Sequence, residues 1–318
     1  MPTLTELETA AETVHAVIPP TPQIRWPLLC QRTGCEVWVK HENHQPVGAF
    51  KVRGGLVLMD ALKRAQPDMA GVISATRGNH GQSLGFAAAR LGLKAVIVVP
   101  HGNSPEKNAA MRALGVELVE HGHDFQEAAE YAAAMAAQYG LTPVPSFHEK
   151  LMLGVASYSL ELLRTVQDLD TVYVPIGLGS GICGMVSARD ALGLRTKVVG
   201  VVSAHAPMYA LSFEAGHPVS HPAETQIADG MACRVPVDEA LAIMRRGVER
   251  IVRVTDAEVE AAMRAYFTDT HNVAEGAGAA PLAALLQEKE RMVGKRVGLV
   301  LSGGNVDRPV FARVLAEE

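Results

Sequence analysis

Residues 94–119 read KAVIVVPHGNSPEKNAAMRALGVELV, and this stretch decides the fold. An apolar run at 94–99 precedes a polar turn, a helical pattern over 104–115 and a second apolar run at 116–119. Ser104 is a residue type that caps a helix start, and Pro105 suits the first helical position. Apolar runs without alternation are typical of parallel strands buried on both faces. The stretch therefore predicts a strand–helix–strand unit of a parallel sheet.

The same alternation continues along the chain. A helical pattern over 255–267 begins with Thr255 and Glu258 in a capping-box arrangement. A chain of 318 residues suggests about two domains, and we find no repeat or flexible linker. We therefore predict an α/β protein of two closely packed lobes, each a mostly parallel twisted sheet flanked by helices. The other predicted strands are 36–40, 71–74, 171–175, 197–202, 251–254 and 296–302.

Composition and charge narrow the class of protein. The net charge is −5 and no basic stripe is present, so nucleic acid is not an expected partner. No apolar run reaches the length of a membrane span, and the first residues lack the core of a signal peptide. The four cysteines, Cys30, Cys35, Cys183 and Cys233, form no CxxC pair. We expect reduced thiols in a cytoplasmic protein without membrane contact.

One lysine stands in an unusual setting. Residues 41–55 read HENHQPVGAFKVRGG, so that Lys51 follows a Pro and a Gly and precedes a Gly pair. The ordinary interpretation of a single lysine is a solvated surface cation. The rest of the sequence must decide whether Lys51 is different.

Three glycine-rich loops directly follow predicted strands. They are SATRGNHGQS (74–83), PIGLGSGICG (175–184) and SGGNVD (302–307). Small residues let backbone N–H groups approach an anion at the helix start that follows. The alternative is a tight turn that needs glycine for its geometry alone.

The second loop also fits a dinucleotide-binding pattern. Gly179, Gly181 and Gly184 form GxGxxG between a strand and a helix. A nicotinamide-dependent oxidoreductase would need an acidic residue after the next strand, which instead ends in Val202 and Ser203. This reading is therefore less favoured.

Four motifs occur together in one order: PVGAFKVRG (46–54), GNHGQ (78–82), GLGSG (177–181) and SGGN (302–305). In this order the chain resembles the fold-type II pyridoxal-phosphate enzymes, in the branch of threonine dehydratase and serine racemase. The resemblance extends over residues 21–307 and implies a fold like that of the tryptophan synthase β subunit. It also implies a homodimer. The implied domains are a large cofactor-binding domain, 1–45 plus 148–318, and a small domain, 46–147.

The resemblance further implies roles for individual residues. Lys51 would hold the cofactor aldehyde as a Schiff base and later move protons, which requires a neutral amine. Asn79 would hydrogen-bond the ring 3′-oxygen, and Ser302 would face the pyridine nitrogen. The implied cofactor residues are Phe50, Lys51, Asn79, Gly177, Leu178, Gly179, Ser180, Gly181, Glu275, Ser302 and Gly303, and the implied substrate residues are Thr76, Arg77, Gly78, Asn79 and His80.

The expected reaction is a β-elimination. A serine hydroxyl leaves the pyridine ring neutral, which disfavours a full carbanion. Lys51 would remove the α-proton, and the cofactor phosphate would protonate the leaving hydroxyl. A β-hydroxy-L-amino acid such as threonine, serine, 3-hydroxyaspartate or phenylserine would give a 2-oxo acid and ammonia. The alternatives are a racemase on the same scaffold and a non-catalytic amino-acid-binding module. No regulatory domain is expected.

Two departures from the family pattern are informative. Residues 202–208 offer no carboxylate where the racemase and many dehydratases bind a divalent metal, so no metal is expected. Arg77 stands where the racemase has a proton-transferring serine. His41 with His44, and HGHD (121–124), do not make a complete metal-ligand set.

His80 has the chemistry of a catalytic base. Within the family pattern a structural role for it is favoured.

Overall fold

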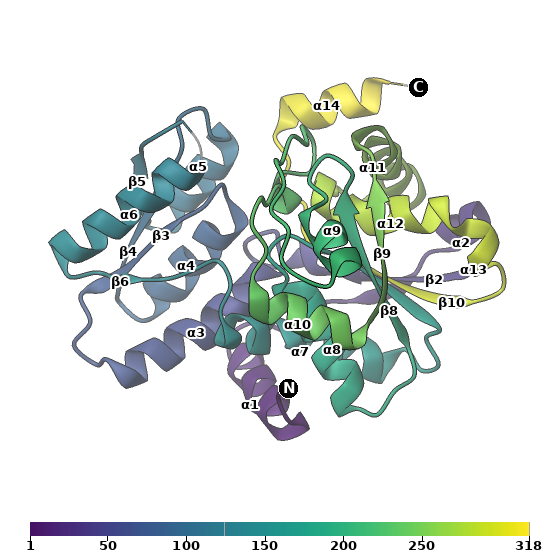
Figure 1. Cartoon of the computed structure of the whole chain (residues 1–318), viewed down its shortest axis with the longest axis horizontal. Helices are drawn as coiled ribbons and strands as arrows, with labels where there is room; N and C mark the ends of the chain where they lie inside the picture. Colours follow the sequence, from purple (N-terminus) through teal and green to yellow (C-terminus); the bar gives the residue numbers. More distant parts are fainter. Residues whose placement is uncertain (124, 318) are drawn as a thin grey trace.

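The computed structural model describes residues 1–123 and 125–317, which form two sheets (Figure 1). The larger has six strands in the order β1-β2-β10-β7-β8-β9, and its β1–β2 pair is antiparallel. The smaller has four parallel strands in the order β5-β4-β3-β6. The strands are β1 (Gln23–Arg25), β2 (Glu36–His41), β3 (Gly71–Ala75), β4 (Lys94–Val99), β5 (Glu117–Glu120), β6 (Thr142–Pro143), β7 (Thr171–Pro175), β8 (Lys197–Ser203), β9 (Val248–Val254) and β10 (Arg296–Leu301).

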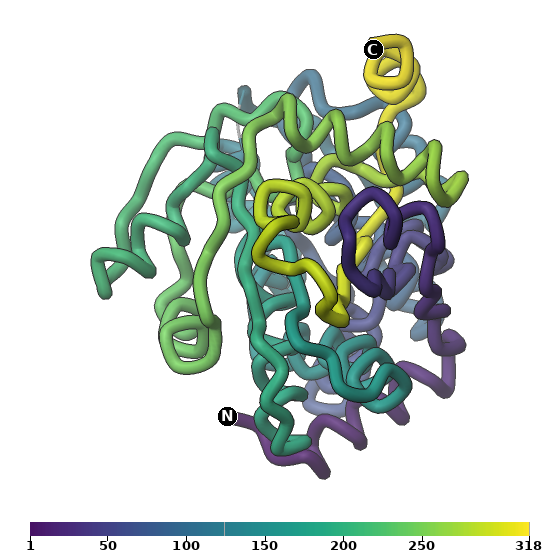
Figure 2. The backbone as a smooth tube through the Cα atoms, turned by 90° about the vertical axis from the view of Figure 1, so that its right-hand side faces the viewer, coloured from purple at the N-terminus to yellow at the C-terminus, as the bar shows by residue number. Residues whose placement is uncertain are grey.

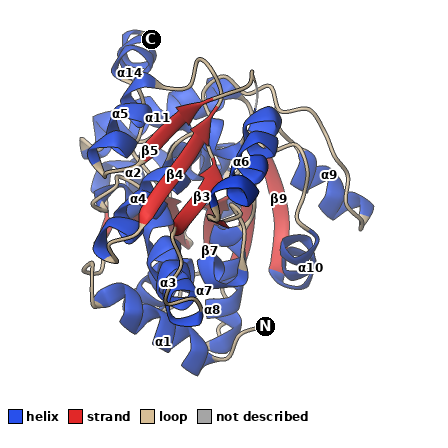
Figure 3. Cartoon of the chain, turned by 90° about the vertical axis from the view of Figure 1, so that its left-hand side faces the viewer, coloured by secondary structure: helices blue, strands red, loops and turns tan. Residues whose placement is uncertain are grey.

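Helices cover both faces of each sheet. In the smaller lobe α6 lies on one face and α4 and α5 lie on the other (Figure 3). In the larger lobe α12 crosses β7 to β10, and α8 packs on β7 and β8 from the other side. The helices are α1 (Leu4–His15), α2 (Pro27–Thr33), η1 (Glu42–His44), α3 (Lys51–Ala65), α4 (Asn79–Arg90), α5 (Pro105–Ala113), α6 (Phe125–Tyr139), α7 (Glu149–Thr165), α8 (Ser180–Ala191), α9 (Met208–Ala215), η2 (Asp229–Met231), α10 (Asp238–Gly247), α11 (Asp256–Thr270), α12 (Gly276–Gln287), α13 (Lys289–Met292) and α14 (Arg308–Ala316).

The α/β prediction is confirmed, and every predicted strand is present. Ser104 Oγ accepts a hydrogen bond from Lys107 N at 3.0 Å, which caps α5 as expected. Thr255 and Glu258 form both hydrogen bonds of a capping box at α11. Sequence analysis missed β1 and β6, because strands of three and two residues are too short to show a periodic pattern.

The two sheets take their strands from different parts of the chain. Strands β3 to β6 lie between residues 71 and 143, and the other strands lie outside this range. The chain termini lie far apart on the larger lobe (Figure 2). No helix among residues 1–123 and 125–317 is long and apolar enough to cross a membrane. The four cysteines form no disulfide with one another.

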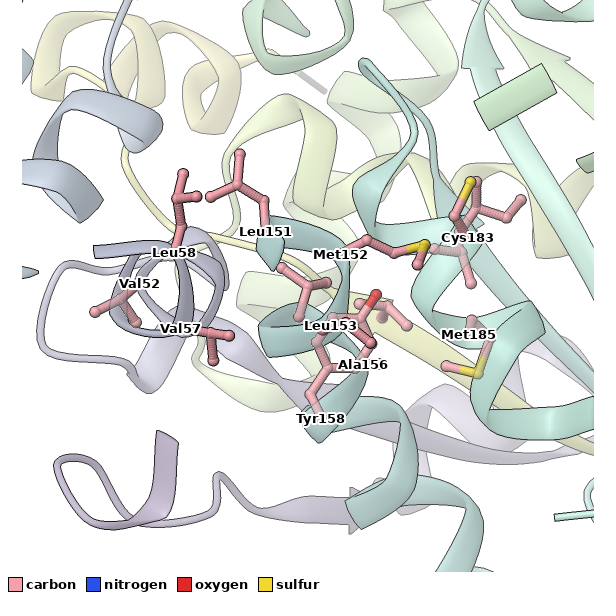
Figure 4. Packing of buried hydrophobic residues seen from close by; sticks show 14 of the residues in the cluster. Val52, Val57, Leu58, Leu151, Met152, Leu153, Ala156, Tyr158, Cys183 and Met185 are labelled. Carbon is pink, nitrogen blue, oxygen red and sulfur yellow. The ribbon is translucent and has the colours of Figure 1, made fainter. Parts of the chain in front are cut away.

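Backbone contact between α3 and α7 joins the lobes. A Cβ atom on Gly154 would lie 2.3 Å from the carbonyl oxygen of Arg53, and one on Gly54 would lie 2.7 Å from that of Leu151. Only glycine permits so close an approach. The apolar side chains around this contact come from α3, α7 and α8 (Figure 4): Val52, Val57, Leu58, Leu151, Met152, Leu153, Ala156, Tyr158, Cys183 and Met185.

A buried cluster of charges anchors the first turn of α3. Arg53 is fully buried and donates to Glu42 at 2.7 Å and to Glu161 at 2.5 Å. Lys40, also fully buried, donates to Glu161 and, at 2.7 Å, to the carbonyl oxygen of Thr21. Removing one partner of such a pair costs about 3–5 kcal/mol, because the other charge stays buried. The cluster thus fixes the helix that begins with Lys51.

Candidate active site

A cavity of about 570 Å³ opens between the lobes. The loops after β3, β7 and β10 contribute to it, as the carboxyl ends of parallel strands do in α/β proteins. It brings together all the predicted cofactor and substrate residues except Gly303. Those that line it are Phe50, Lys51, Thr76, Arg77, Gly78, Asn79, His80, Gly177, Leu178, Gly179, Ser180, Gly181, Glu275 and Ser302.

Lys51 is the first residue of α3 and reaches into this cavity. Its Nζ lies 3.4 Å from Ser180 Oγ and 5.2 Å from the ring centroid of Phe50. Burial lowers the pKa of Lys51, although the Cys233 and Glu275 side chains oppose the shift. A lowered pKa leaves more of the amine neutral, the form that attacks an aldehyde. The ordinary reading of Lys51 as a surface cation is therefore wrong.

Residues 177–181 form a cradle between β7 and the start of α8. Gly179 has φ +107°, and a Cβ there would lie 2.8 Å from Met244 Cε. A Cβ on Gly177 would lie 2.4 Å from the carbonyl oxygen of Gly230. Space and dihedral angle thus both require glycine here. A turn without side chains at a helix N-terminus suits a phosphate group, so this site fits a phosphorylated cofactor.

A chain of polar side chains runs from the cavity wall to the loop after β10. Asn79 Nδ2 donates to Glu275 Oε1 at 2.8 Å, and Asn305 Nδ2 donates to Asn79 Oδ1 at 2.8 Å. These bonds join the start of α4 to the loop after β10 and to the residue before α12. The amide of Asn79 is therefore held in one orientation toward the cavity.

Ser302 and Gly303 connect the end of β10 to the segment before Lys51. Phe50 N donates to the carbonyl oxygen of Ser302 at 2.9 Å, and Ala49 and Gly303 form an isolated antiparallel bridge. Ser302 is buried and lines the cavity, whereas Gly303 lies behind it. A Cβ on Gly303 would lie 2.6 Å from Glu275 Oε1, so Gly303 leaves room for that carboxyl group.

The 76–80 loop places one cation and one neutral ring at the cavity. Arg77 is exposed, lines the cavity and makes no hydrogen bond or ion pair with the described residues. Both ring nitrogens of His80 are buried without a partner among those residues. Burial, assisted by the Lys51 charge, lowers the pKa of His80 to about 3. The imidazole is therefore neutral at physiological pH.

Sequence analysis missed part of the cavity wall. Lys107 of α5 forms an ion pair with Asp229 of η2, across the two lobes, and its stem lies against Gly78. Cys233 and Phe125 also line the cavity. The burial that raises the pKa of the Cys233 thiol to about 11 keeps it protonated. A lysine in a polar helix and an acid in a 3₁₀ helix of three residues carry no periodic signal that would have revealed this pairing.

The histidine pairs noted in the sequence have other partners. His41 accepts a hydrogen bond from Trp26 Nε1 at 2.9 Å and stacks on His44, and His121 stacks on Tyr131. Asp124 of the HGHD segment lies outside the described residues. Within residues 1–123 and 125–317, no group of three or more His, Cys, Asp or Glu side chains could hold a metal ion.

Comparison with known proteins gives a consistent picture. The family model described as "Pyridoxal-phosphate dependent enzyme" matches residues 14–303. The biosynthetic L-threonine dehydratase of Salmonella typhimurium is 36% identical over 90% of this chain, which spans 56% of that protein. The L-threonine ammonia-lyase of Geobacter sulfurreducens is 37% identical over 87% of this chain and 69% of its own length. This chain thus spans little more than half of the first relative.

Solved structures of similar proteins share the whole fold. Threonine deaminase isoform 2 of Solanum lycopersicum has a TM-score of 0.90 at 28% identity and covers 99% of this chain and 94% of its own. Maize serine racemase has a TM-score of 0.92 at 25% identity and covers 99% of this chain and 97% of its own. A threonine deaminase and a serine racemase are therefore both similar to this chain in structure.

Proposed function

Because this chain belongs to the family of pyridoxal-phosphate dependent enzymes, we propose that it is a dehydratase, or ammonia-lyase. Its substrate would be a β-hydroxy-L-amino acid such as threonine, serine or phenylserine, and its products a 2-oxo acid and ammonia. One observation carries this proposal: the half-buried amine of Lys51 and the glycine cradle at 177–181 line the same cavity. The names of the relatives at 36% and 37% identity support it.

The residues present fit pyridoxal phosphate. When bound, the cofactor supplies an aldehyde that captures the amino group of the substrate and a ring that acidifies its Cα–H bond. Lys51 is proposed to bind the aldehyde, and the 177–181 cradle is proposed to hold the phosphate. Asn79 is proposed to donate to the ring oxygen, and Ser302 to face the ring nitrogen.

Lys51 also has the properties of the proton-moving group. Burial lowers its pKa, so more of the free amine is neutral and able to accept a proton than in an exposed lysine. The Ser302 hydroxyl can donate a hydrogen bond but does not give up its proton to a ring nitrogen, which favours elimination. The substrate carboxylate is proposed to bind the backbone N–H groups of the 76–80 loop, next to the neutral ring of His80.

Racemisation is the second candidate, since maize serine racemase covers 99% of this chain. It requires proton transfer on both faces of the α-carbon. Arg77 holds the place where the racemase pattern has a serine, and a guanidinium does not release its proton near neutral pH. Elimination from one face is therefore the favoured reaction.

A homodimeric, cytoplasmic enzyme is also proposed, with domains 1–45 plus 148–318 and 46–147. The sequence resemblance supports the dimer and the domain division, and the confinement of β3 to β6 to residues 71–143 also supports the domain division. The small number of cysteines, without a CxxC pair, supports the cytoplasmic location. Light scattering of the purified holoenzyme tests the dimer. Limited proteolysis tests the domain boundaries.

A substrate panel tests the proposed function. The purified protein is loaded with pyridoxal phosphate and incubated with L- and D-forms of threonine, serine, 3-hydroxyaspartate and phenylserine. We expect ammonia and a 2-oxo acid in equal amounts from at least one L-substrate. Enantiomer interconversion without 2-oxo acid would instead identify a racemase, and no turnover of any compound would contradict both functions.

A further inference from the structure

The carboxyl group of Glu275 is only half paired. Its side chain is 3% exposed and lines the cavity. Oε1 accepts a hydrogen bond from Asn79 Nδ2, whereas Oε2 has no partner among the described residues. A buried carboxylate oxygen without a donor is costly, and a proton on that oxygen lowers the cost. The setting of Oε2 thus favours a carboxyl group that holds a proton.

The charged groups facing Glu275 come from three other elements. Lys107 of α5 favours the ionised carboxylate, and Asp229 of η2 opposes it. Lys51 of α3 is also close enough to interact with the carboxylate charge. Burial outweighs the lysine charges and the hydrogen bonds from Asn79 and the Asn305 backbone, and it raises the pKa of Glu275 to about 7. Near neutral pH the group is therefore balanced between its two protonation states.

Asn79 links this carboxyl to the proposed position of the cofactor ring. Its Oδ1 accepts from Asn305 Nδ2, which also donates to the carbonyl oxygen of Val47 at 2.8 Å. One N–H of Asn79 is used by Glu275, which leaves the second N–H for a ligand. A ring oxygen held by that N–H would share the Asn79 amide with the Glu275 carboxyl group.

We propose that Glu275 is a positioning residue that stores a proton beside Asn79 and so sets the protonation state of the bound cofactor. When Oε2 is ionised, its negative charge opposes negative charge on the ring oxygen. When Oε2 takes up one proton from solvent, that opposition ends. The inference rests on the proposed contact of Asn79 with the ring.

The visible spectrum of the holoenzyme, titrated with pH and without substrate, tests this inference. Wild-type enzyme should show a spectral step near pH 7, and Glu275→Gln, which keeps an oxygen for Asn79, should lose it. Glu224→Gln is the control, because Glu224 is an exposed acid at the same cavity, and it should keep the step. A step that persists in Glu275→Gln, or one that is lost in Glu224→Gln as well, overturns the proposal.

Infrared spectroscopy provides a second test on the unmodified holoenzyme, should Glu275→Gln fail to fold. Between about pH 6 and about pH 8 ordinary carboxyls do not titrate. A protonated-carboxyl band should disappear over this range, and a spectrum without such a band contradicts the proposal. Neither measurement requires turnover. The inference about Glu275 can therefore fail while the proposed dehydratase activity is confirmed. It can also be confirmed while the proposed dehydratase activity fails.

Discussion

Replacing Gly154 by Ala should disturb both stability and catalysis. The new Cβ would lie 2.3 Å from the carbonyl oxygen of Arg53, whereas ordinary contacts begin at 3.4 Å. Helix α3 must therefore move away from α7 by about 1 Å. Overpacking of this kind costs about 1–3 kcal/mol, and the better helix propensity of alanine returns about 1 kcal/mol. We expect a net loss of up to about 2 kcal/mol in the free energy of unfolding.

Gly154→Ala should lower the catalytic rate by more than its loss in the free energy of unfolding suggests. Lys51 begins α3, so movement of the helix displaces its amine from the cavity geometry. A displacement of about 1 Å can lower the rate about 10²-fold. Urea unfolding followed by circular dichroism measures the stability, and the initial rate of 2-oxo acid release measures the catalysis.

Gly184→Ala is the matched control. Gly184 lies in α8 and packs on the other side of α7, where a Cβ would meet Ala156 atoms at 3.1–3.4 Å. This contact requires a smaller shift and does not involve α3. The loss in the free energy of unfolding and the loss in catalytic rate should therefore both be smaller than for Gly154→Ala. The reasoning is refuted if Gly154→Ala unfolds at the wild-type urea concentration and keeps the wild-type rate. Lost stability with an unchanged rate would show that the contact packs the lobes without positioning Lys51.

Three further predictions test the site. Lys51→Ala should lose turnover and the absorption of covalently held cofactor while keeping its circular dichroism spectrum; a variant with normal absorption and rate would contradict the assignment. Exhaustive chelation should leave activity intact, because residues 202–208 offer no carboxylate, and a loss that magnesium reverses would show a metal requirement. With a pure L-substrate, 2-oxo acid should form ~10²-fold faster than the D-isomer, since Arg77 cannot act as the second acid–base group. Arg77→Ser should gain racemisation, and equal rates of both products in the unmodified enzyme would disprove the role given to Arg77.

The sequence by itself determined the secondary structure and the composition of most of the site. The run at 94–99 and the cap at Ser104 act between residues close in the chain, so their pattern can be read locally. The glycines of 177–181 and the setting of Lys51 also lie within short motifs. These features indicated an α/β fold and a cofactor site before any contact was known.

Only the tertiary structure decided which distant groups meet and how their charges are balanced. The ion pair of Lys107 with Asp229 joins residues 122 positions apart, and the bond of Asn79 to Glu275 spans 196 positions. Among the described residues Glu275 Oε2 has no partner, which follows from the packing of elements that carry no common sequence pattern. The pKa of a buried group depends on the solvent and charges that the whole fold removes or brings near it. For that reason the sequence could indicate which residues form the site, but not which of them hold protons.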